Sequence, residues 1–105
     1  PTVIPAYQAL QMATCNGAEV LGLTKQTGRL TPGLKADIIL MNLNHAHMTP
    51  CYDLVANLVY ASQASDVETV IVDGRILMQN RQLKTINEPE VIAQCRAIAS
   101  RLTGV

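Results

Sequence analysis

The stretch TGRLTPGLKADIIL, Thr27 to Leu40, decides the fold of this 105-residue chain, because helix-forming sequence gives way to strand-forming sequence there. Residues 28–30 predict a short strand, and Thr31-Pro32-Gly33 has the composition of a turn. The run 36–43 that follows is almost continuously apolar, and this pattern predicts a strand buried on both of its faces. The stretch therefore predicts the entry into a sheet.

Two glycines and one aspartate stand out within this stretch. Gly28 and Gly33 suit backbone positions that a β-carbon would crowd. Asp37 lies at the mouth of the apolar strand, where a carboxylate costs free energy unless backbone N–H groups or a cation satisfy it. We interpret Asp37 as a structural residue that pins a turn, not as a catalytic group.

The sequence before this stretch predicts two helices in tandem. Residues 5–14 combine a proline in the first turn with strong helix formers and one apolar face. Asn16-Gly17 should break this helix, and Asn16 can cap a second one. Glu19 completes a capping-box pattern, and Gly22 is suited to end the second helix.

The sequence after the stretch predicts an irregular segment, a hairpin and a last helix. From residue 45 to 66 the pattern is irregular, with one or two helical turns expected across 53–60. Asp73-Gly74 separates two strand-forming runs within 68–78 and is typical of a two-residue hairpin turn. A final helix should begin after Asn87, with a proline in its first turn, and continue through Arg101.

Composition narrows the class of protein. The chain is 49% hydrophobic but has no Trp or Phe, so its core must be aliphatic and thin, which suits elements that pack against more protein. Eight basic residues balance eight acidic ones, and this predicts no nucleic-acid or membrane partner. Three cysteines without a CxxC spacing favour a reduced, cytoplasmic setting. No signal peptide or spanning segment is expected, and the start at Pro1, without Met, indicates a chain cut midway.

Several motifs resemble one known family. The pattern G-x-L-x-x-G-x-x-A-D-I-I-L in 28–40 resembles the strand pair that follows the catalytic barrel in the amidohydrolase superfamily. Residues 12–23 are similar to that superfamily's MAT-x-NGA-x-x-LGL helix pair. The segments 50–53, 58–61 and 67–74 resemble a narrower branch, which contains S-adenosylhomocysteine and methylthioadenosine deaminases and s-triazine chlorohydrolases.

The resemblance implies an α+β fragment of a larger enzyme. Residues 1–26 would be the last helices of a (β/α)8 barrel. Residues 27–86 would be the C-terminal half of a small composite β-sandwich, and 87–105 a terminal helix that packs back on the barrel. The expected partners are the remainder of that barrel, or self-association through exposed apolar helix faces.

The resemblance also implies the chemistry of the whole enzyme. In this family one divalent metal, usually zinc or iron, activates a water that attacks an amidine-like ring carbon. Ammonia, or in some members chloride, then departs. The parent is thus expected to deaminate an adenosine-like thioether, with a chlorohydrolase or another amidohydrolase of the branch as the alternative. The family's metal ligands and catalytic residues would all precede Pro1, so we expect no catalytic, cofactor-binding or metal-binding residue in this chain.

His45-Ala46-His47 is the one motif that suggests a metal site by itself. On an extended strand, residues i and i+2 point to the same face, so both imidazoles could reach one ion. A metal site needs three or four ligands, and the nearby candidates are Cys51, Asp53 and Asp66. A site made of His45, His47 and Cys51 is the less favoured interpretation. Exposed or packed loop histidines are the favoured one.

Other chemically suggestive residues are given structural roles. Cys15 and Cys95 are interpreted as small buried apolar residues, since a reactive thiol needs a local cation or a helix N-terminus. Ser62, Ser65 and Asp66 are interpreted as a polar loop, because no His stands at a recognisable spacing from them. Arg75 is expected to be a solvated hairpin residue. Asn57 and Tyr60 are expected to be buried hydrogen-bonding residues at the seam between sandwich and barrel.

Two functions outside the enzyme class stay open at this point. One is a stand-alone, non-catalytic β-sandwich module that hides its apolar helix faces by self-association. The other is a small metal-binding protein that uses His45 and His47. Barrel loops set specificity in the superfamily, so the substrate of the parent enzyme cannot be chosen from these residues.

Overall fold

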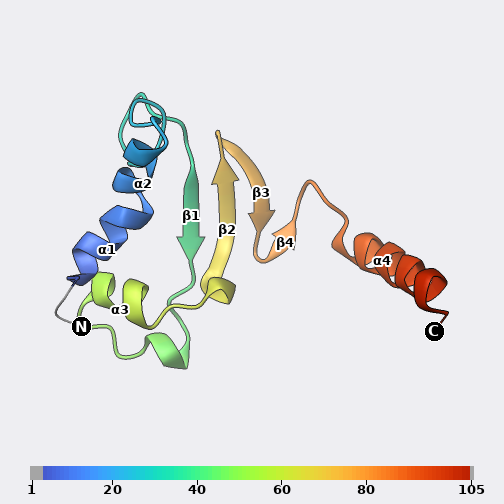
Figure 1. Cartoon of the computed structure of the whole chain (residues 1–105). Coiled ribbons are helices and arrows are strands. Elements are labelled where there is room, and N and C mark those ends of the chain that lie inside the picture. The colour runs from blue at the N-terminus through green and yellow to red at the C-terminus, as the bar shows by residue number, and fades with distance from the viewer. Residues whose placement is uncertain (1–3, 105) are drawn as a thin grey trace.

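The structure, a computed structural model, describes residues 4–104 and consists of helices, short 3₁₀ turns and one sheet (Figure 1). Expectations about residues 1–3, in the barrel part, and about Val105, in the terminal helix part, lie outside the described residues. In chain order the elements are α1 (Ala6–Ala13), α2 (Cys15–Val20), β1 (Ile38–Met41), η1 (Ala46–Met48), α3 (Leu54–Tyr60), η2 (Ala64–Asp66), β2 (Val67–Val72), β3 (Arg75–Gln79), β4 (Gln82–Leu83) and α4 (Glu88–Thr103).

The four strands form one antiparallel sheet in the order β1-β2-β3-β4. The hairpin between β2 and β3 is confirmed. Asp73 and Gly74 both have positive φ, 50° and 77°, as a primed two-residue turn requires. The amide N–H of Gly74 donates to the carbonyl of Ala36 over 3.0 Å, which joins the hairpin turn to the chain just before β1.

Strand β4 was not predicted. Asn80 and Arg81 reverse the chain before it with φ of 51° and 65°, in the left-handed region that non-glycine residues adopt less easily. Hydrogen bonds offset this cost. The backbone N–H of Arg81 donates to the Glu68 carbonyl over 3.0 Å, and its Nη1 donates to the Val67 carbonyl over 2.9 Å.

The stretch from Thr27 to Leu40 is less regular than its sequence predicts. Residues 28–30 form no strand, so that prediction is wrong; they lie as an irregular segment beside α2. The crowding expected at Gly28 is confirmed, because a β-carbon there would lie 2.8 Å from the Ala18 Cβ. The prediction that a β-carbon would be crowded at Gly33 is wrong, since nothing lies within 4 Å of a β-carbon built there. A φ of +95° is what favours glycine at Gly33.

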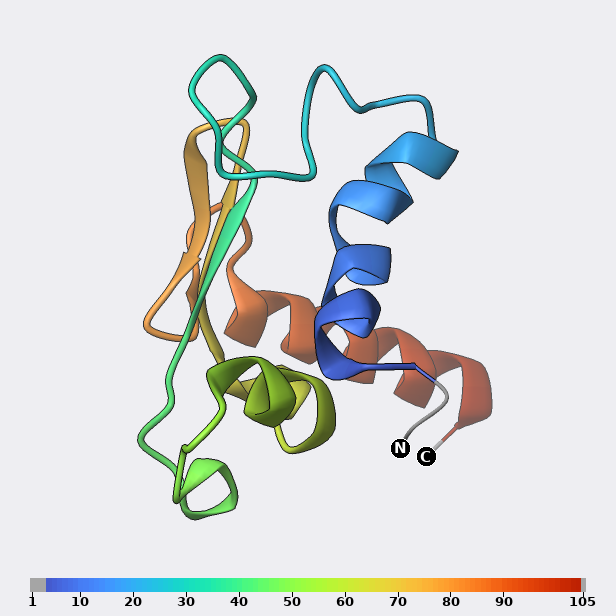
Figure 2. The same ribbon diagram turned by 90° about the vertical axis from the view of Figure 1, so that its left-hand side faces the viewer.

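Strand β1 is shorter and more exposed than predicted. It covers four residues, and its central pair, Ile39 and Leu40, are 54% and 51% exposed. The prediction that this strand is buried on both faces is therefore wrong for the described residues. The physical reason is incomplete cover: the helical layer of α1 and α2 stands beside the sheet, but no described element covers the whole strand (Figure 2).

The two tandem helices near the start are confirmed as α1 and α2, but the predicted cap is wrong. Helix α2 already begins at Cys15, so Asn16 lies inside its first turn, and Thr14 occupies the cap position without a side-chain cap bond. The Thr14 hydroxyl instead donates to the Leu10 carbonyl over 2.8 Å. Gly22, with φ of +72°, follows the end of α2 as expected.

The cap predicted at Asn87 is confirmed, and the helical turns expected across 53–60 are present as α3, which begins at a cap that was not predicted. The Asp53 carboxylate accepts from the Ala56 N–H over 3.1 Å and begins α3. The Asn87 side chain accepts from the Glu90 N–H over 3.2 Å and begins α4. Helix α4 continues to Thr103, slightly beyond the predicted end, and Gly104 follows in the left-handed conformation.

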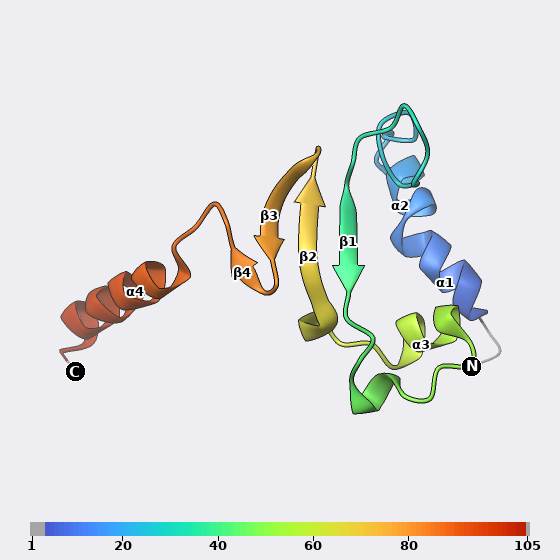
Figure 3. The same cartoon turned by 180° about the vertical axis from the view of Figure 1, so that it is seen from behind.

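Little of the chain is buried. Among residues 4–104, only Ala18, Met48 and Met78 are buried hydrophobic side chains. Helix α1 contacts α3, but α4 makes no extensive contact with another described element and lies apart from the sheet (Figures 1 and 3). Its apolar residues Val91, Ile92, Ile98 and Leu102 are all exposed. No described helix is both long and apolar enough to cross a membrane.

Candidate functional site

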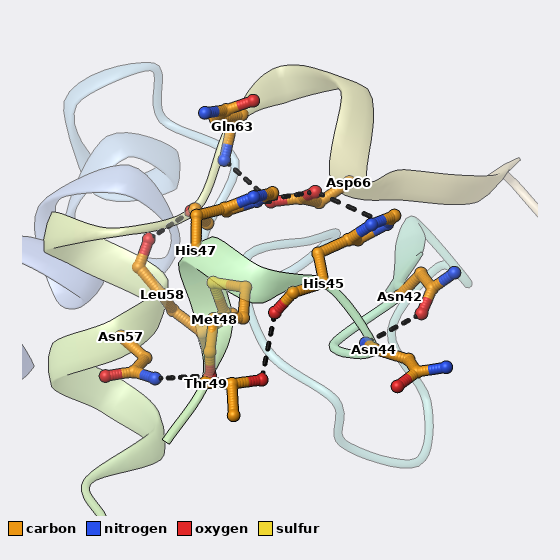
Figure 4. A network of polar contacts seen from close by, with 11 residues as sticks. Asn42, Asn44, His45, His47, Met48, Thr49, Asn57, Leu58, Gln63 and Asp66 are labelled. Carbon is orange, nitrogen blue, oxygen red and sulfur yellow. Dashed lines mark hydrogen bonds and ion pairs between the residues drawn. The ribbon is translucent and has the colours of Figure 1, made fainter. Parts of the chain in front are cut away.

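The polar cluster with the most contacts is made of His45, His47 and Asp66. His45 follows β1 as extended chain, and His47 lies in the short helix η1. Asp66 is the last residue of η2, directly before β2 begins. The fold thus brings together groups from the two ends of the segment that connects β1 with β2 (Figure 4).

His47 makes a close ion pair with Asp66. Its Nε2 lies 2.9 Å from Oδ1 and 2.7 Å from Oδ2 of the carboxylate. An ionised carboxylate only accepts hydrogen bonds, so the proton of this interaction is on Nε2. His45 is the second partner, with its Nε2 3.7 Å from Oδ1. The two imidazole rings are stacked, 5.4 Å apart and 9° from parallel.

Asp66 is buried and is bound from several sides. Its side chain is 2% exposed, whereas those of His45 and His47 are 42% and 31% exposed. The Gln63 N–H donates to Oδ2 over 2.8 Å, and the Asp66 carbonyl accepts from the Asn42 N–H over 2.8 Å. The Gln63 N–H, first, and the His47 side chain, second, lower the pKa of Asp66, while its burial acts in the opposite direction.

Further hydrogen bonds fix the chain around the histidines. The Thr49 hydroxyl donates to the His45 carbonyl over 3.0 Å. The Asn57 side-chain amide, in α3, donates to the carbonyls of Met48 and Pro50 over 3.0 and 3.2 Å. Met48 itself is 1% exposed. The segment after β1 is therefore attached both to α3 and to the start of β2.

The described residues do not fit a divalent metal. Within residues 4–104, no group of three His, Cys, Asp or Glu side chains is arranged to hold an ion. The structure does not bring Cys51 into a site with the two histidines, and the Asp53 carboxylate caps α3. Both oxygens of Asp66 already accept hydrogen bonds. The packed-histidine interpretation of His47 is thus favoured over the metal site. The expectation that no catalytic residue lies in this chain stays a prediction.

The cysteines differ from their prediction in part. Cys15 is partly buried, with its Sγ 3.8 Å from the Gln11 carbonyl oxygen. Cys95 is exposed, so its predicted burial is wrong for the described chain, because no described element covers the apolar face of α4. Cys51 is exposed as well.

The Asp37 carboxylate accepts a backbone hydrogen bond, as its interpretation as a structural residue requires. Its Oδ1 accepts from the Asp73 N–H over 2.8 Å, which ties the residue before β1 to the hairpin turn. This N–H lowers the pKa of Asp37 most, and the Thr27 side chain lowers it further. The carboxylate therefore has a clear structural partner.

The remaining candidates are mostly structural. The Ser62 hydroxyl donates to the Leu58 carbonyl at the end of α3, while Ser65 and Arg75 are exposed. Asn57 is partly buried and bonded, as expected. Tyr60 is 53% exposed, so its predicted burial is wrong here, although its hydroxyl donates to the Ile4 carbonyl over 3.3 Å.

The pairing of His47 with Asp66 was missed from the sequence. Asp66 was considered only as a possible metal ligand or as part of a serine-rich loop. Their separation of 19 positions in the sequence gives no local signal. One hint was available: Gln63 and Asp66 have the spacing of a capping box, and the Gln63 N–H donates to the Asp66 carboxylate as such a box requires.

The described residues thus form a small α+β unit whose polar cluster is an ion-pair network and not a metal centre. The model of the Amidohydrolase family matches residues 1–77, and the chain belongs to this family. This agrees with the resemblance drawn from the sequence motifs.

Relatives and solved structures agree with this assignment. The 5-methylthioadenosine/S-adenosylhomocysteine deaminase of Syntrophomonas wolfei subsp. wolfei is 60% identical over 104 residues, which are 99% of this chain and 24% of that protein. The zinc-bound adenosine deaminase of Xanthomonas campestris matches 96% of this chain with 23% of its own, at a TM-score of 0.86 and 26% identity. The zinc complex of atrazine chlorohydrolase TrzN from Arthrobacter aurescens TC1 matches 90% of this chain with 20% of its own, at 0.79 and 26%. The chain spans about a quarter of the length of the curated relative.

Proposed function

We propose that the chain is the C-terminal structural part of a metal-dependent amidohydrolase that hydrolytically deaminates an adenosine-like thioether. The observation that carries this proposal is the 60% identity, over nearly the whole chain, with a 5-methylthioadenosine/S-adenosylhomocysteine deaminase. Because the match covers 24% of that relative, the activity belongs to a whole protein and not to these residues alone.

The exposed apolar surface supports a role as part of something larger. Helix α4 leaves Val91, Ile92, Ile98 and Leu102 exposed, and α2 and the loop after it leave Val20 and Leu21 exposed at 85% and 72%. Uncovered apolar surface of this kind is typical of an interface. In the proposal, residues 1–26 end the catalytic barrel, 27–86 contribute to a composite β-sandwich, and 87–105 pack back on the barrel.

In this proposal the catalytic reaction takes place in the part of the enzyme that lies outside this chain. The described residues contain no fitting set of metal ligands, so no step of the reaction is assigned to them. A divalent metal, zinc or iron, is proposed for the barrel; the bound zinc in the two similar solved structures supports zinc. The metal would supply an activated water. The residues of this chain would hold the sandwich and the last barrel helices in place.

The experiment is a comparison of two proteins. The whole protein that contains this chain should release ammonia from 5-methylthioadenosine or S-adenosylhomocysteine, and a chelator should abolish the release. The isolated 105-residue chain should retain no stoichiometric zinc and turn over neither compound. Deamination by the isolated chain would contradict the proposal.

A chlorohydrolase of the same branch is the second candidate. The similarity to atrazine chlorohydrolase TrzN, at a TM-score of 0.79, is the observation that favours it. Chloride release from atrazine without ammonia release from the two nucleosides would select this candidate. Size-exclusion chromatography tests the stand-alone module, because a well-folded monomer that exposes no apolar surface would favour that module over the enzyme part.

A further inference from the structure

We propose that His45, His47 and Asp66 form an acid-released latch that fastens residues 44–66, with α3 among them, to the start of β2. The latch is not a catalytic site. It is a device that holds one connection of the fold closed while Asp66 is ionised and lets it open when Asp66 takes up a proton.

Asp66 joins three parts of the chain at one residue. Its backbone carbonyl accepts from the Asn42 N–H, directly after β1. Its carboxylate accepts from the Gln63 N–H at the start of η2, and from the Nε2 of His47 in η1. Opening of the carboxylate contacts would therefore loosen η1 and η2 together, while the backbone bonds of Asp66 to Asn42 and Gln63 would remain.

The two histidines supply the side-chain contacts that the release would weaken. Among the described residues, the titratable side chains that face Asp66 are His45 and His47, from the extended chain and from η1. The Nε2 of His47 lies 2.7 Å from Oδ2 of Asp66, and the Nε2 of His45 lies 3.7 Å from Oδ1. Protonation of the carboxylate removes its negative charge and therefore weakens both contacts.

The direction of the pH dependence follows from the carboxylate. The Gln63 N–H and His47 hold the pKa of Asp66 below its ordinary value of about 3.9. A group whose folded pKa is depressed stabilises the fold above its unfolded pKa, and that contribution is lost as pH falls through the folded pKa. The latch is thus closed at neutral pH and opens only as pH falls below the ordinary aspartate range, through the lowered pKa of Asp66.

The latch couples the sheet to the helical layer. Helix α3 contacts α1, and the Tyr60 hydroxyl at the end of α3 donates to the Ile4 carbonyl before α1. Asn57 of α3 holds the carbonyls of Met48 and Pro50, next to the latch. If residues 1–26 end a barrel, which rests on the proposed function, the latch fixes the sandwich relative to that barrel.

Hydrogen exchange read by mass spectrometry on the whole protein tests the latch without using activity. His47→Ala should raise exchange within residues 42–66 at pH 7 by about tenfold or more, because it removes hydrogen bonds to a charged group. His45→Ala is the matched control, and its longer, exposed contact predicts less than about a fivefold rise. Peptides from α4, within 91–101, should not change in either variant.

The acid arm uses the unmodified protein and Asp66→Asn. In the unmodified protein, exchange in 42–66, corrected for the intrinsic effect of pH, should rise as pH falls below the ordinary aspartate range, before exchange in α4 does. Asp66→Asn should lose this acid-dependent rise. If that variant does not fold, the unmodified pH series and His47→Ala still decide. Unchanged exchange in His47→Ala, or a rise across all peptides together on acidification, would overturn the latch. A lack of deaminase activity would leave these readouts unaffected and would count only against the proposed function.

Discussion

Replacing Gly28 with alanine probes the contact that places the irregular segment 21–37 against α2. Gly28 has φ of +101°, a backbone conformation that L side chains rarely adopt. A new β-carbon would lie 2.8 Å from the Ala18 Cβ, 3.2 Å from the Cys15 Cα and 3.2 Å from the Thr14 carbonyl oxygen. None of these atoms is the end of a flexible side chain, so the segment itself would have to move.

The expected cost has two parts. Alanine in a sparsely populated backbone region costs about 1–3 kcal/mol. Inserting a carbon into a filled contact adds about 1–3 kcal/mol. The sum of about 2–6 kcal/mol is large against the stability of about 5–15 kcal/mol that is typical of a domain. Gly28→Ala should therefore open this segment locally even where the rest of the protein stays folded.

Gly33→Ala is the matched control. Its φ of +95° is nearly the same, but nothing lies within 4 Å of the carbon it would add. Only the backbone cost of about 1–3 kcal/mol applies there. The difference between the two variants thus isolates the packing cost of about 1–3 kcal/mol, which is about a 5- to 150-fold difference in local opening.

The assay is amide hydrogen exchange on the whole protein, followed at two backbone hydrogen bonds of this segment. The Leu23 N–H donates to the Ala18 carbonyl, and the Lys35 N–H donates to the Gln26 carbonyl, each over 2.7 Å. Both amides should exchange faster in Gly28→Ala than in Gly33→Ala. Equal exchange in the two variants would refute the reasoning, because it would mean that Gly28 has free space beside α2.

Two further predictions concern single hydrogen bonds, and a third concerns metal binding, since the described residues contain no set of metal ligands. Asn87→Ala should weaken the start of α4 by about 1 kcal/mol, seen as faster exchange of its first amides, while Asn87→Asp keeps the cap and should change little. Asp37→Asn should weaken the bond from the Asp73 N–H. Because the pKa of Asp37 is lowered in the folded state, its contribution should be lost only as pH falls below the ordinary aspartate range, as exchange at the hairpin turn would report. Dialysis of the isolated chain against zinc should leave no stoichiometric metal, and one tightly bound ion per chain would contradict this.

The features that were predicted correctly from the sequence depend on neighbouring residues. The turn at Asp73-Gly74 needs two positive φ angles, which this pair supplies within the turn itself. The cap at Asn87 needs one side-chain oxygen three residues before an amide. Such signals lie within a few residues, so they can be read without knowing the fold.

The features that were missed depend on distant residues or on missing cover. The ion pair of His47 with Asp66 joins residues 19 apart, and no spacing rule predicts it. The turn before β4 places Arg81 at positive φ, where hydrogen bonds to Val67 and Glu68 compensate. The apolar pattern of β1 predicts burial on both faces, but a pattern cannot tell which layer supplies the cover.

Covering layers also explain the exposure of Cys95. Its position on the apolar face of α4 predicts burial, and within the described residues that face is uncovered. Under the proposed function the same face packs on the barrel. That contact would explain why the face is apolar, and why it is exposed among the described residues alone.

The measurement that tests the central claim most directly is ammonia release by the whole protein that contains this chain. With 5-methylthioadenosine or S-adenosylhomocysteine as substrate, the account predicts release that stops on metal removal and returns when zinc or iron is restored. The 105-residue chain alone should release none. Metal-loaded whole protein that releases no ammonia from either compound, or release by the isolated chain, would contradict the account.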